Sequence, residues 1–315
     1  MNVKKILVGA SASAILMVST AIPALADSIG AFDFESPTYT VGNINGQDGW
    51  SKTGSYDSEV DSVASFANAA GFGFGAQALR ISNAVTSGAF GDQTISPGLT
   101  IEAKEGTATS HFEASFSIGS TQATQQSGLF LSVSPDDGQG SRMSYVGFDD
   151  QADGIHVIFY DVTDAGPLPT VASFNRTDVA TINRTSAHTV KFVIDLVSGP
   201  ANDVVKLYVD GILEITGTTW EDYYRYDPEQ TGNGNKVPGI SHLIMPVRGI
   251  ASPSTLDNGY LIDNVSLSSL ALPSDKNQCK KDGWKDLTDA NGNSFKNQGD
   301  CVSYVASEGK AKGNP

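Results

Sequence analysis

Alternation of hydrophobic and polar residues with a period of two is the dominant pattern along this chain. In residues 204–213 (VVKLYVDGIL) every second side chain is aliphatic until the Asp210-Gly211 pair, which is typical of a half-buried strand followed by a tight hairpin turn. Residues 111–118 alternate in the same way, with Phe112 on the apolar face and Glu113 on the polar face. The pattern predicts strands with one face in a core and the other in water.

Helical periodicity is nearly absent, and strand-like runs are frequent and separated by Gly, Asn, Asp and Ser. Such spacing predicts an all-β protein, an antiparallel jelly-roll β-sandwich. The runs cover residues 31–35, 78–82, 111–118, 128–134, 142–148, 154–162, 170–175, 188–197, 204–213, 242–247 and 260–267.

Two of these runs carry a resemblance to a known group of proteins. Residues 204–213, with their YVDG turn, and residues 260–267 (YLIDNVSL) resemble strands of the concanavalin A-like lectin and glucanase group, which includes laminin G-type modules. The resemblance covers roughly residues 27–270. It implies a sandwich fold and an extracellular polysaccharide or glycan as partner, and we expect an exported glycan-binding or surface-interaction module.

The N-terminus predicts export. Lys4 and Lys5 precede an apolar run at residues 6–18, and Ala-Leu-Ala at 24–26 provides a cleavage site, so residues 1–26 are expected to be a secretory signal peptide. The apolar run is too short to span a membrane well, so we expect a secreted protein, periplasmic or extracellular, without membrane insertion. The sandwich would then occupy residues 27–270.

A change in composition follows the last predicted strand. Residues 271–278 are expected to be a linker, and residues 279–315 contain the only two cysteines, Cys279 and Cys301. Two cysteines in an exported protein most simply form a disulfide, which would stabilise this small unit by roughly 3 kcal/mol. This segment resembles a short two-cysteine element found at the C-terminus of bacterial exported proteins, and the resemblance implies no activity.

Charge narrows the classes of partner. The formal net charge is −15, and residues 27–270 contain 11 basic and 29 acidic residues. A body this acidic repels nucleic acid and anionic membranes, so neither is expected to bind. The sequence does not predict the oligomeric state.

Aromatic residues provide the candidate ligand contacts. Residues 219–226 (TWEDYYRY) place four aromatic rings beside three charges, and a glycan-binding site would stack sugar rings on them. The alternative is that Trp220 and one tyrosine cover a sheet edge. The candidate ligand-binding residues are Trp220, Tyr223, Tyr224, Tyr226 and, in a separate loop, Trp50.

A hydrolase is disfavoured because the paired-acid strand of the related glucanases, E-x-D-x-E, is missing. The nearest analogue places His111 and Glu113 on one face of a strand, but Ser115 stands where a second acid is needed. Glu59 and Asp61 also lie two residues apart, in a short polar segment that we expect to be a loop.

A polysaccharide lyase is the preferred enzymatic alternative. The resemblance implies an arginine to neutralise a uronate, with a histidine and a tyrosine for proton transfer. His156 and Tyr160 are four residues apart on one predicted strand, and Arg142 lies on the preceding one. The alternative is that His156 and Tyr160 are ordinary residues on a strand face. A third hypothesis is a structural extracellular protein without a small ligand.

Calcium is a candidate cofactor, because hard cations take oxygen ligands in acidic loops. One candidate site combines Asp33 with Asp263, if the first and last strands are neighbours as in the resembled fold. The others are the loop that contains Asp136 and Asp137 and the acidic segment at residues 149–153. Plain solvated loops are the alternative at each of these positions.

Overall fold

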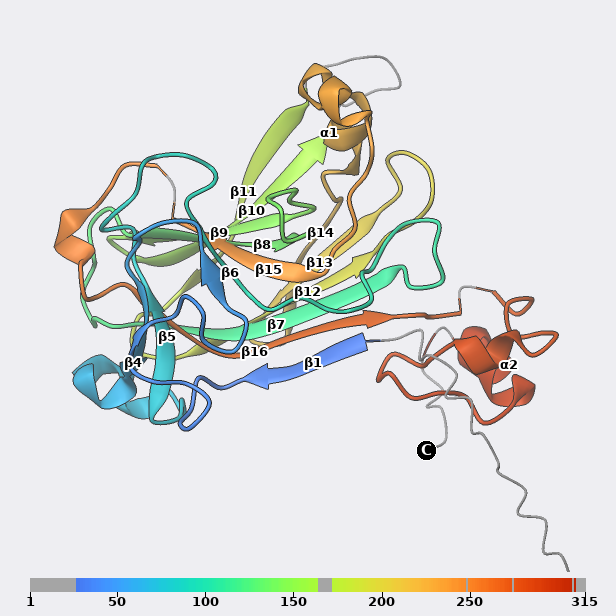
Figure 1. Cartoon of the computed structure of the whole chain (residues 1–315), viewed down its shortest axis with the longest axis horizontal. Helices are drawn as coiled ribbons and strands as arrows, with labels where there is room; N and C mark the ends of the chain where they lie inside the picture. Colours follow the sequence, from blue (N-terminus) through green and yellow to red (C-terminus); the bar gives the residue numbers. More distant parts are fainter. Residues whose placement is uncertain (1–26, 164–171, 248, 274, 308, 310–315) are drawn as a thin grey trace, which may run out of the picture.

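The chain is a β-sandwich of two antiparallel sheets, as the sequence predicted (Figure 1). The computed structural model describes residues 27–163, 172–247, 249–273, 275–307 and 309. The expected signal peptide, residues 1–26, lies outside the described residues. Within the described ranges, no helix is long and apolar enough to cross a membrane.

Nine strands form the first sheet, and their bounds are β1 Asp27–Phe32, β2 Gly42–Asn43, β4 Ser58–Ser62, β5 Gln77–Ile81, β7 His111–Ser120, β12 His188–Asp195, β13 Val204–Val209, β14 Ile212–Gly217 and β16 Tyr260–Leu270. The strand order is β14-β13-β12-β7-β16-β5-β4-β2, and β1 pairs with β16. The first and last strands of the sandwich are therefore neighbours.

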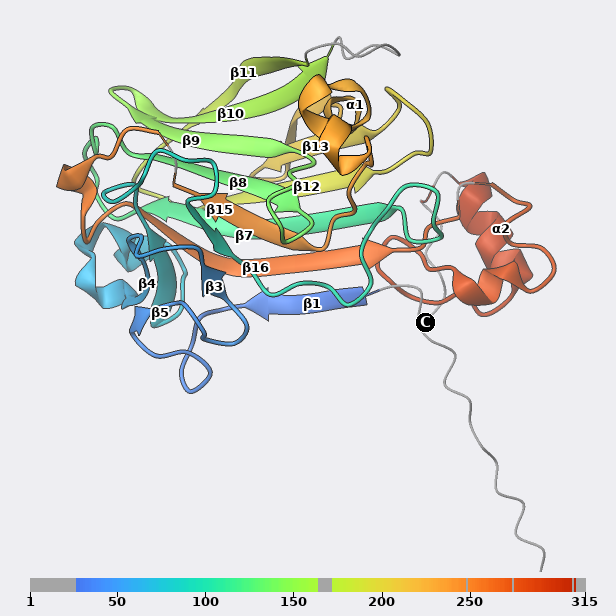
Figure 2. The same ribbon diagram turned by 45° about the horizontal axis from the view of Figure 1, so that its top comes forward.

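Seven strands form the second sheet, and their bounds are β3 Ser51–Lys52, β6 Gln93–Ile95, β8 Phe130–Asp136, β9 Tyr145–Gln151, β10 Gly154–Thr163, β11 Ser173–Ile182 and β15 His242–Pro246. Their order is β11-β10-β9-β8-β15-β6-β3. Figure 2 shows β8 to β11 lying above β7 and β16 of the first sheet.

The core lies between the sheets and is built by the alternation seen in the sequence. Phe112 and Phe116 of β7 are fully buried, and the ring of Phe116 meets the ring of Phe148 from the second sheet at a centroid distance of 6.0 Å. The predicted hairpin joins β13 to β14, with Asp210 at φ 50° and Gly211 at φ 78°. Positive φ at both central residues matches the right-handed twist of paired strands.

Helical elements are short and lie outside the sheets. Helix α1 follows β14 and contains most of the aromatic segment that the sequence singled out. The bounds are α1 Glu221–Tyr226, α2 Gln298–Ala306, and the 3-10 segments η1 Val63–Ser65, η2 Ala67–Gly71, η3 Pro228–Asn233, η4 Pro253–Thr255 and η5 Gly283–Asp286.

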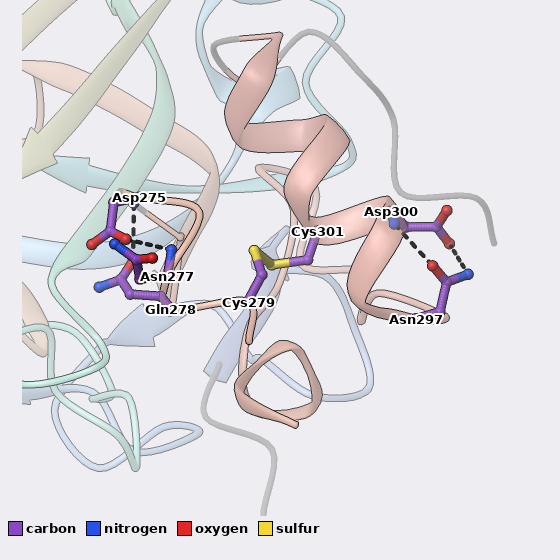
Figure 3. The surroundings of a disulfide bond; sticks show 7 residues. All are labelled: Asp275, Asn277, Gln278, Cys279, Asn297, Asp300 and Cys301. Carbon is purple, nitrogen blue, oxygen red and sulfur yellow. Dashed lines mark hydrogen bonds between the residues drawn. A yellow bond between two sulfur atoms is a disulfide. The ribbon is translucent and has the colours of Figure 1, made fainter. Parts of the chain in front are cut away.

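The C-terminal region forms a separate small unit at the end of β16 (Figure 1). A disulfide joins Cys279 to Cys301 (Figure 3), as expected from the sequence. Both cysteines are buried with Phe295 and Tyr304 in a core of their own. Asn297 begins α2 as its N-cap, because its side chain accepts a hydrogen bond from the Asp300 N–H at 3.0 Å.

Two local expectations were wrong. Glu59 and Asp61 lie on strand β4 and not in a loop. Glu59 pairs in register with Arg80 of β5, and the positive charge of Arg80 offsets the acidic side chains on this face of β4. Arg142 lies before β9, in the connection from β8, where it forms an isolated bridge with Asp136.

Candidate functional site

A hollow of about 480 Å³ on the outer face of the second sheet is lined mainly by aromatic rings. Three strands supply its base, because Phe130 comes from β8, Tyr145 from β9 and Tyr160 from β10. Loops supply the rim, with Phe90 on one side and Ile250 on the other. We call this hollow the aromatic groove.

Strand register and one glycine shape the base of the aromatic groove. Tyr145 and Tyr160 are register partners, and their ring centroids are 4.3 Å apart with an interplanar angle of 34°. Gly147 points to the same face as Tyr145, and a Cβ built there would lie 2.8 Å from the ring of Phe130. The absence of a side chain at this position allows the Phe130 ring to lie across β9.

The rim of the aromatic groove exposes apolar surface to solvent. Phe90 is 60% exposed and Ile250 is 92% exposed. Arg142 holds Phe90 from below, because its guanidinium carbon lies 5.7 Å from the ring centroid and its Nη2 donates to the Phe90 carbonyl. Nη2 also donates to Gln93 Oε1 at 3.2 Å, which anchors Arg142 to β6. Arg142 thus anchors the Phe90 side of the rim.

Two of the predicted ligand-binding aromatics contact residues of the groove without lining it. Trp220 is buried and its Nε1 donates to the Tyr160 carbonyl at 3.0 Å, while its ring meets Tyr145 edge-on at 6.2 Å. Tyr224 is also buried, which raises the pKa of its hydroxyl, and this hydroxyl donates to the Arg142 carbonyl at 3.0 Å. Neither residue presents a ring face to solvent, so both act on a ligand only through the residues they support.

The other predicted aromatics differ in exposure. Trp50 is buried in the sandwich core, where its ring meets Phe32 at 5.6 Å and Phe34 at 5.4 Å, so it offers no surface for stacking. Tyr223 and Tyr226 are half-buried beside the core. A binding role for these two residues stays a prediction.

The candidate lyase residues are only partly brought together. Tyr160 lines the aromatic groove and Arg142 supports its rim, but His156 lies outside the lining. His156 is held in two ion pairs, with Asp178 at 2.5 Å and Asp153 at 2.9 Å, and its hydrogen bond to Asp178 raises its pKa. These contacts account for the position of His156 without a substrate.

His111 and Glu113 lie on the opposite sheet from the aromatic groove. His111 Nδ1 is 2.6 Å from Asp195 and its Nε2 is 3.4 Å from Glu113, which in turn pairs with Lys191 at 2.8 Å. Burial lowers the pKa of His111, but hydrogen bonding to Asp195 and Glu113 outweighs burial and raises the pKa to about 8. Both ring nitrogens of His111 thus face a carboxylate of the protein itself.

The candidate calcium ligands divide into two kinds of environment. Asp136 Oδ1 accepts hydrogen bonds from the N–H groups of Gly138 and Gly140, and Asp137 Oδ1 accepts from Gln139 and Ser141, so both carboxylates cap their own loop. Burial raises the pKa of Asp136 to about 6. Loop capping accounts for Asp137 Oδ1 and Asp136 Oδ1, whereas Asp136 Oδ2 is buried without a hydrogen-bond partner among the described residues.

Asp263 is a buried carboxyl close to the charges of two other acids. Burial raises its pKa to about 6, and the charges of Glu35 and Asp33 add to the rise. Within the described part of the chain, no group of three or more His, Cys, Asp or Glu side chains is arranged to hold a metal. A calcium ion at Asp263 and Asp33 would therefore need backbone carbonyls as further ligands, and the site stays a prediction.

Sequence reasoning missed three residues of the aromatic groove: Phe90, Phe130 and Tyr145. A signal was present in residues 142–148, where Tyr145 and Gly147 alternate with Val146 and Phe148. A glycine next to an outward-facing aromatic on the same face of a strand marks a position where a neighbouring ring can lie across the sheet.

No protein-family model matches the chain, and no curated protein sequence matches it. The similar solved structures include an endo-β-1,4-glucuronan lyase from the fungus Trichoderma reesei, with 12% identity, a TM-score of 0.40, and coverage of 72% of this chain and 92% of that one. An endo-1,3-β-glucanase from Streptomyces sioyaensis has 11% identity and a TM-score of 0.42, covering 79% and 98%. Sheep galectin-11 has 10% identity and a TM-score of 0.27, covering 50% and 90%. These similarities are too low to transfer an activity, and membership of the concanavalin A-like group stays a prediction.

Proposed function

We propose that this protein binds a glycan chain in the aromatic groove. The observation that carries the proposal is the apolar rim and base formed by Phe90, Phe130 and Tyr160, held open on a rigid sheet. Sugar rings have apolar faces that pack against aromatic side chains, and binding sites combine such surfaces with a few fixed polar groups. An exposed aromatic surface held by contacts from Trp220 and Arg142 suits this kind of ligand.

Binding is favoured over cleavage by the chemistry of the lining. Glycoside hydrolysis normally needs two carboxyl groups flanking the scissile bond, and the described residues that line the aromatic groove include no Asp, Glu or His. A lyase is the second candidate, because Tyr160 lies in the groove and can exchange a proton. The ion pairs of His156 weaken that alternative.

Export is part of the same proposal. The Cys279–Cys301 disulfide supports it, because disulfides persist in oxidising compartments. A secreted glycan-binding protein would meet its polysaccharide outside the cytoplasm.

The test is binding and cleavage measured together. The purified protein is incubated with a panel of neutral and uronate polysaccharides, and pull-down is followed alongside new reducing or unsaturated ends. We expect retention without new ends, loss of retention in Phe90→Ala and Tyr160→Ala, and full retention in Ile212→Ala, which removes an exposed aliphatic side chain on β14.

Tyr160→Phe separates the two candidate functions, because it keeps the ring and removes the hydroxyl. New ends that disappear in Tyr160→Phe, with binding intact, would establish the lyase. The absence of both binding and new ends across the panel would leave the structural role as the remaining hypothesis.

A further inference from the structure

A second cavity lies on the outer face of the first sheet, away from the aromatic groove. Its volume is about 870 Å³, and its walls come from η1–η2, the β7–β8 connection and the loop before β16. The residues that line it include Phe66 and Asn68 on one wall and Gln122 and Asn258 on the other. We call this cavity the Arg80 cleft.

A buried guanidinium forms part of its lining. Arg80 is 1% exposed, and its Nε donates to Asp61 at 2.5 Å. Its Nη1 donates to Asp57 at 2.8 Å and to the Asn258 carbonyl at 3.2 Å. These contacts fix the plane of the guanidinium. They use two of its three nitrogens, Nε and Nη1, and the remaining nitrogen is Nη2.

Arg80 Nη2 is surrounded by acids at longer distances. It is 3.8 Å from Glu59 Oε2 and 4.0 Å from Asp257 Oδ1, which are ion-pair distances and exceed a normal hydrogen bond. Glu59 has a side chain that is 44% exposed, and Asp257 one that is 85% exposed. At these separations no hydrogen bond joins Nη2 to either carboxylate, and a ligand oxygen placed to one side, in the cleft, can lie at hydrogen-bond distance from both Nη2 and one of the carboxylates.

This geometry matches a hydroxyl group. A hydroxyl oxygen can accept a hydrogen bond from Arg80 Nη2 while its proton is donated to Glu59 or Asp257. The amides of Gln122 and Asn258 lie on the same wall, joined by a hydrogen bond at 2.5 Å, and Phe66 offers an apolar surface opposite. We propose that the Arg80 cleft is a second binding site, which takes a neutral, hydroxyl-rich ligand such as a sugar unit without a carboxylate.

Charge decides the class of ligand. Asp57 and Asp61 already neutralise Arg80, so Glu59 and Asp257 leave the cleft negative. A uronate is therefore repelled. A metal ion is disfavoured too, because it would have to approach the Arg80 guanidinium. This site does not depend on the aromatic groove.

The test uses ligand-detected NMR and calorimetry with glucose, galactose, mannose and N-acetylglucosamine, alongside glucuronate and calcium. The protein carries Phe90→Ala, so that binding in the aromatic groove does not contribute. We expect a neutral sugar to bind, and the added substitutions Glu59→Ala and Asp257→Ala to weaken it about 10- to 100-fold, since each removes a hydrogen bond to a charged group.

The matched control is Glu102→Ala, because the Glu102 side chain is 46% exposed and lies outside the Arg80 cleft. The affinity of this variant for the neutral sugar should equal that of the Phe90→Ala protein. Binding of glucuronate in preference to neutral sugars, binding of calcium alone, unchanged affinity in Glu59→Ala, or no binding by any neutral sugar would each overturn the proposal. The aromatic-groove proposal is judged separately, by the effect of Phe90→Ala on polysaccharide retention.

Discussion

The indole nitrogen of Trp220 donates a hydrogen bond to the backbone carbonyl of Tyr160, over 3.0 Å. This contact joins the start of helix α1 to strand β10 beside the aromatic groove. Trp220 is thus a support for the ring that faces the ligand, and its effect on binding must pass through Tyr160.

Trp220→Phe tests this relationship. The substitution keeps an aromatic ring but leaves the Tyr160 carbonyl without its donor, so we expect a loss of about 1 kcal/mol in unfolding free energy. Glycan affinity should change much less than in Tyr160→Ala. Urea denaturation and calorimetry on the same samples measure both quantities. Complete loss of binding by a folded Trp220→Phe protein would show that the indole itself contacts the ligand.

Gly147→Ala tests the shape of the aromatic groove. The new Cβ would lie 2.8 Å from the Phe130 ring, which must move outward into the groove. We expect overpacking to cost about 1–3 kcal/mol of stability, together with weaker glycan retention. Gly232→Ala is the control, because a Cβ there has no atom within 4 Å. Equal retention by both variants would contradict the placement of the ligand over β9.

The network of His111 predicts a pH dependence of stability. The pKa of His111 is raised from 6.5 to about 8, so the folded state binds this proton more tightly than the unfolded state. This difference adds about 2 kcal/mol to the free energy of unfolding. The added stability is fully present below pH 6.5 and is lost as the pH rises through about 8.

Denaturation midpoints at pH 6 and pH 9 provide the measurement. Other groups also titrate in this range, notably Asp203, whose pKa burial raises to about 7. The difference between the wild-type protein and His111→Gln isolates the histidine. If stability depends on pH in the same way in His111→Gln as in the wild type, His111 is not the source of the pH dependence.

Asp263→Asn tests the predicted calcium site. Because burial raises the pKa of Asp263 to about 6, ionisation of this carboxyl destabilises the fold above that pH when no cation is present. In EDTA at pH 8, Asp263→Asn should therefore be more stable than the wild type by about 1–2 kcal/mol. Calcium should raise the Tm of the wild type only. A calcium-induced shift that survives in Asp263→Asn would place the ion elsewhere.

Removal of the disulfide should act locally. Cys279→Ser with Cys301→Ser should destabilise the C-terminal unit by about 3 kcal/mol, while the sandwich keeps its own core. Limited proteolysis should then cut within residues 275–307 and leave the sandwich intact. The Tm of the sandwich should be unchanged. A fall in the Tm of the sandwich together with that of the C-terminal unit would show that the two units unfold together.

Much of the fold was predictable because strand signals are local. The alternation in β7 and β13 and the Asp210-Gly211 turn depend on neighbours in sequence, and each is confirmed by register and φ values. The pairing of β4 with β5 was not predictable, because Glu59 and Asp61 look like loop residues until Arg80 lies beside them.

The sequence by itself determined the β-sandwich, the hairpin between β13 and β14, and two cysteines within one short unit, since these follow from local periodicity and spacing. Only the tertiary structure decided which aromatic rings face solvent. Trp50 and Trp220 are buried, whereas Phe90 is exposed, although all three are large aromatics in polar segments. Exposure depends on what the rest of the chain places over a residue, and those contacts join strands that are far apart in sequence.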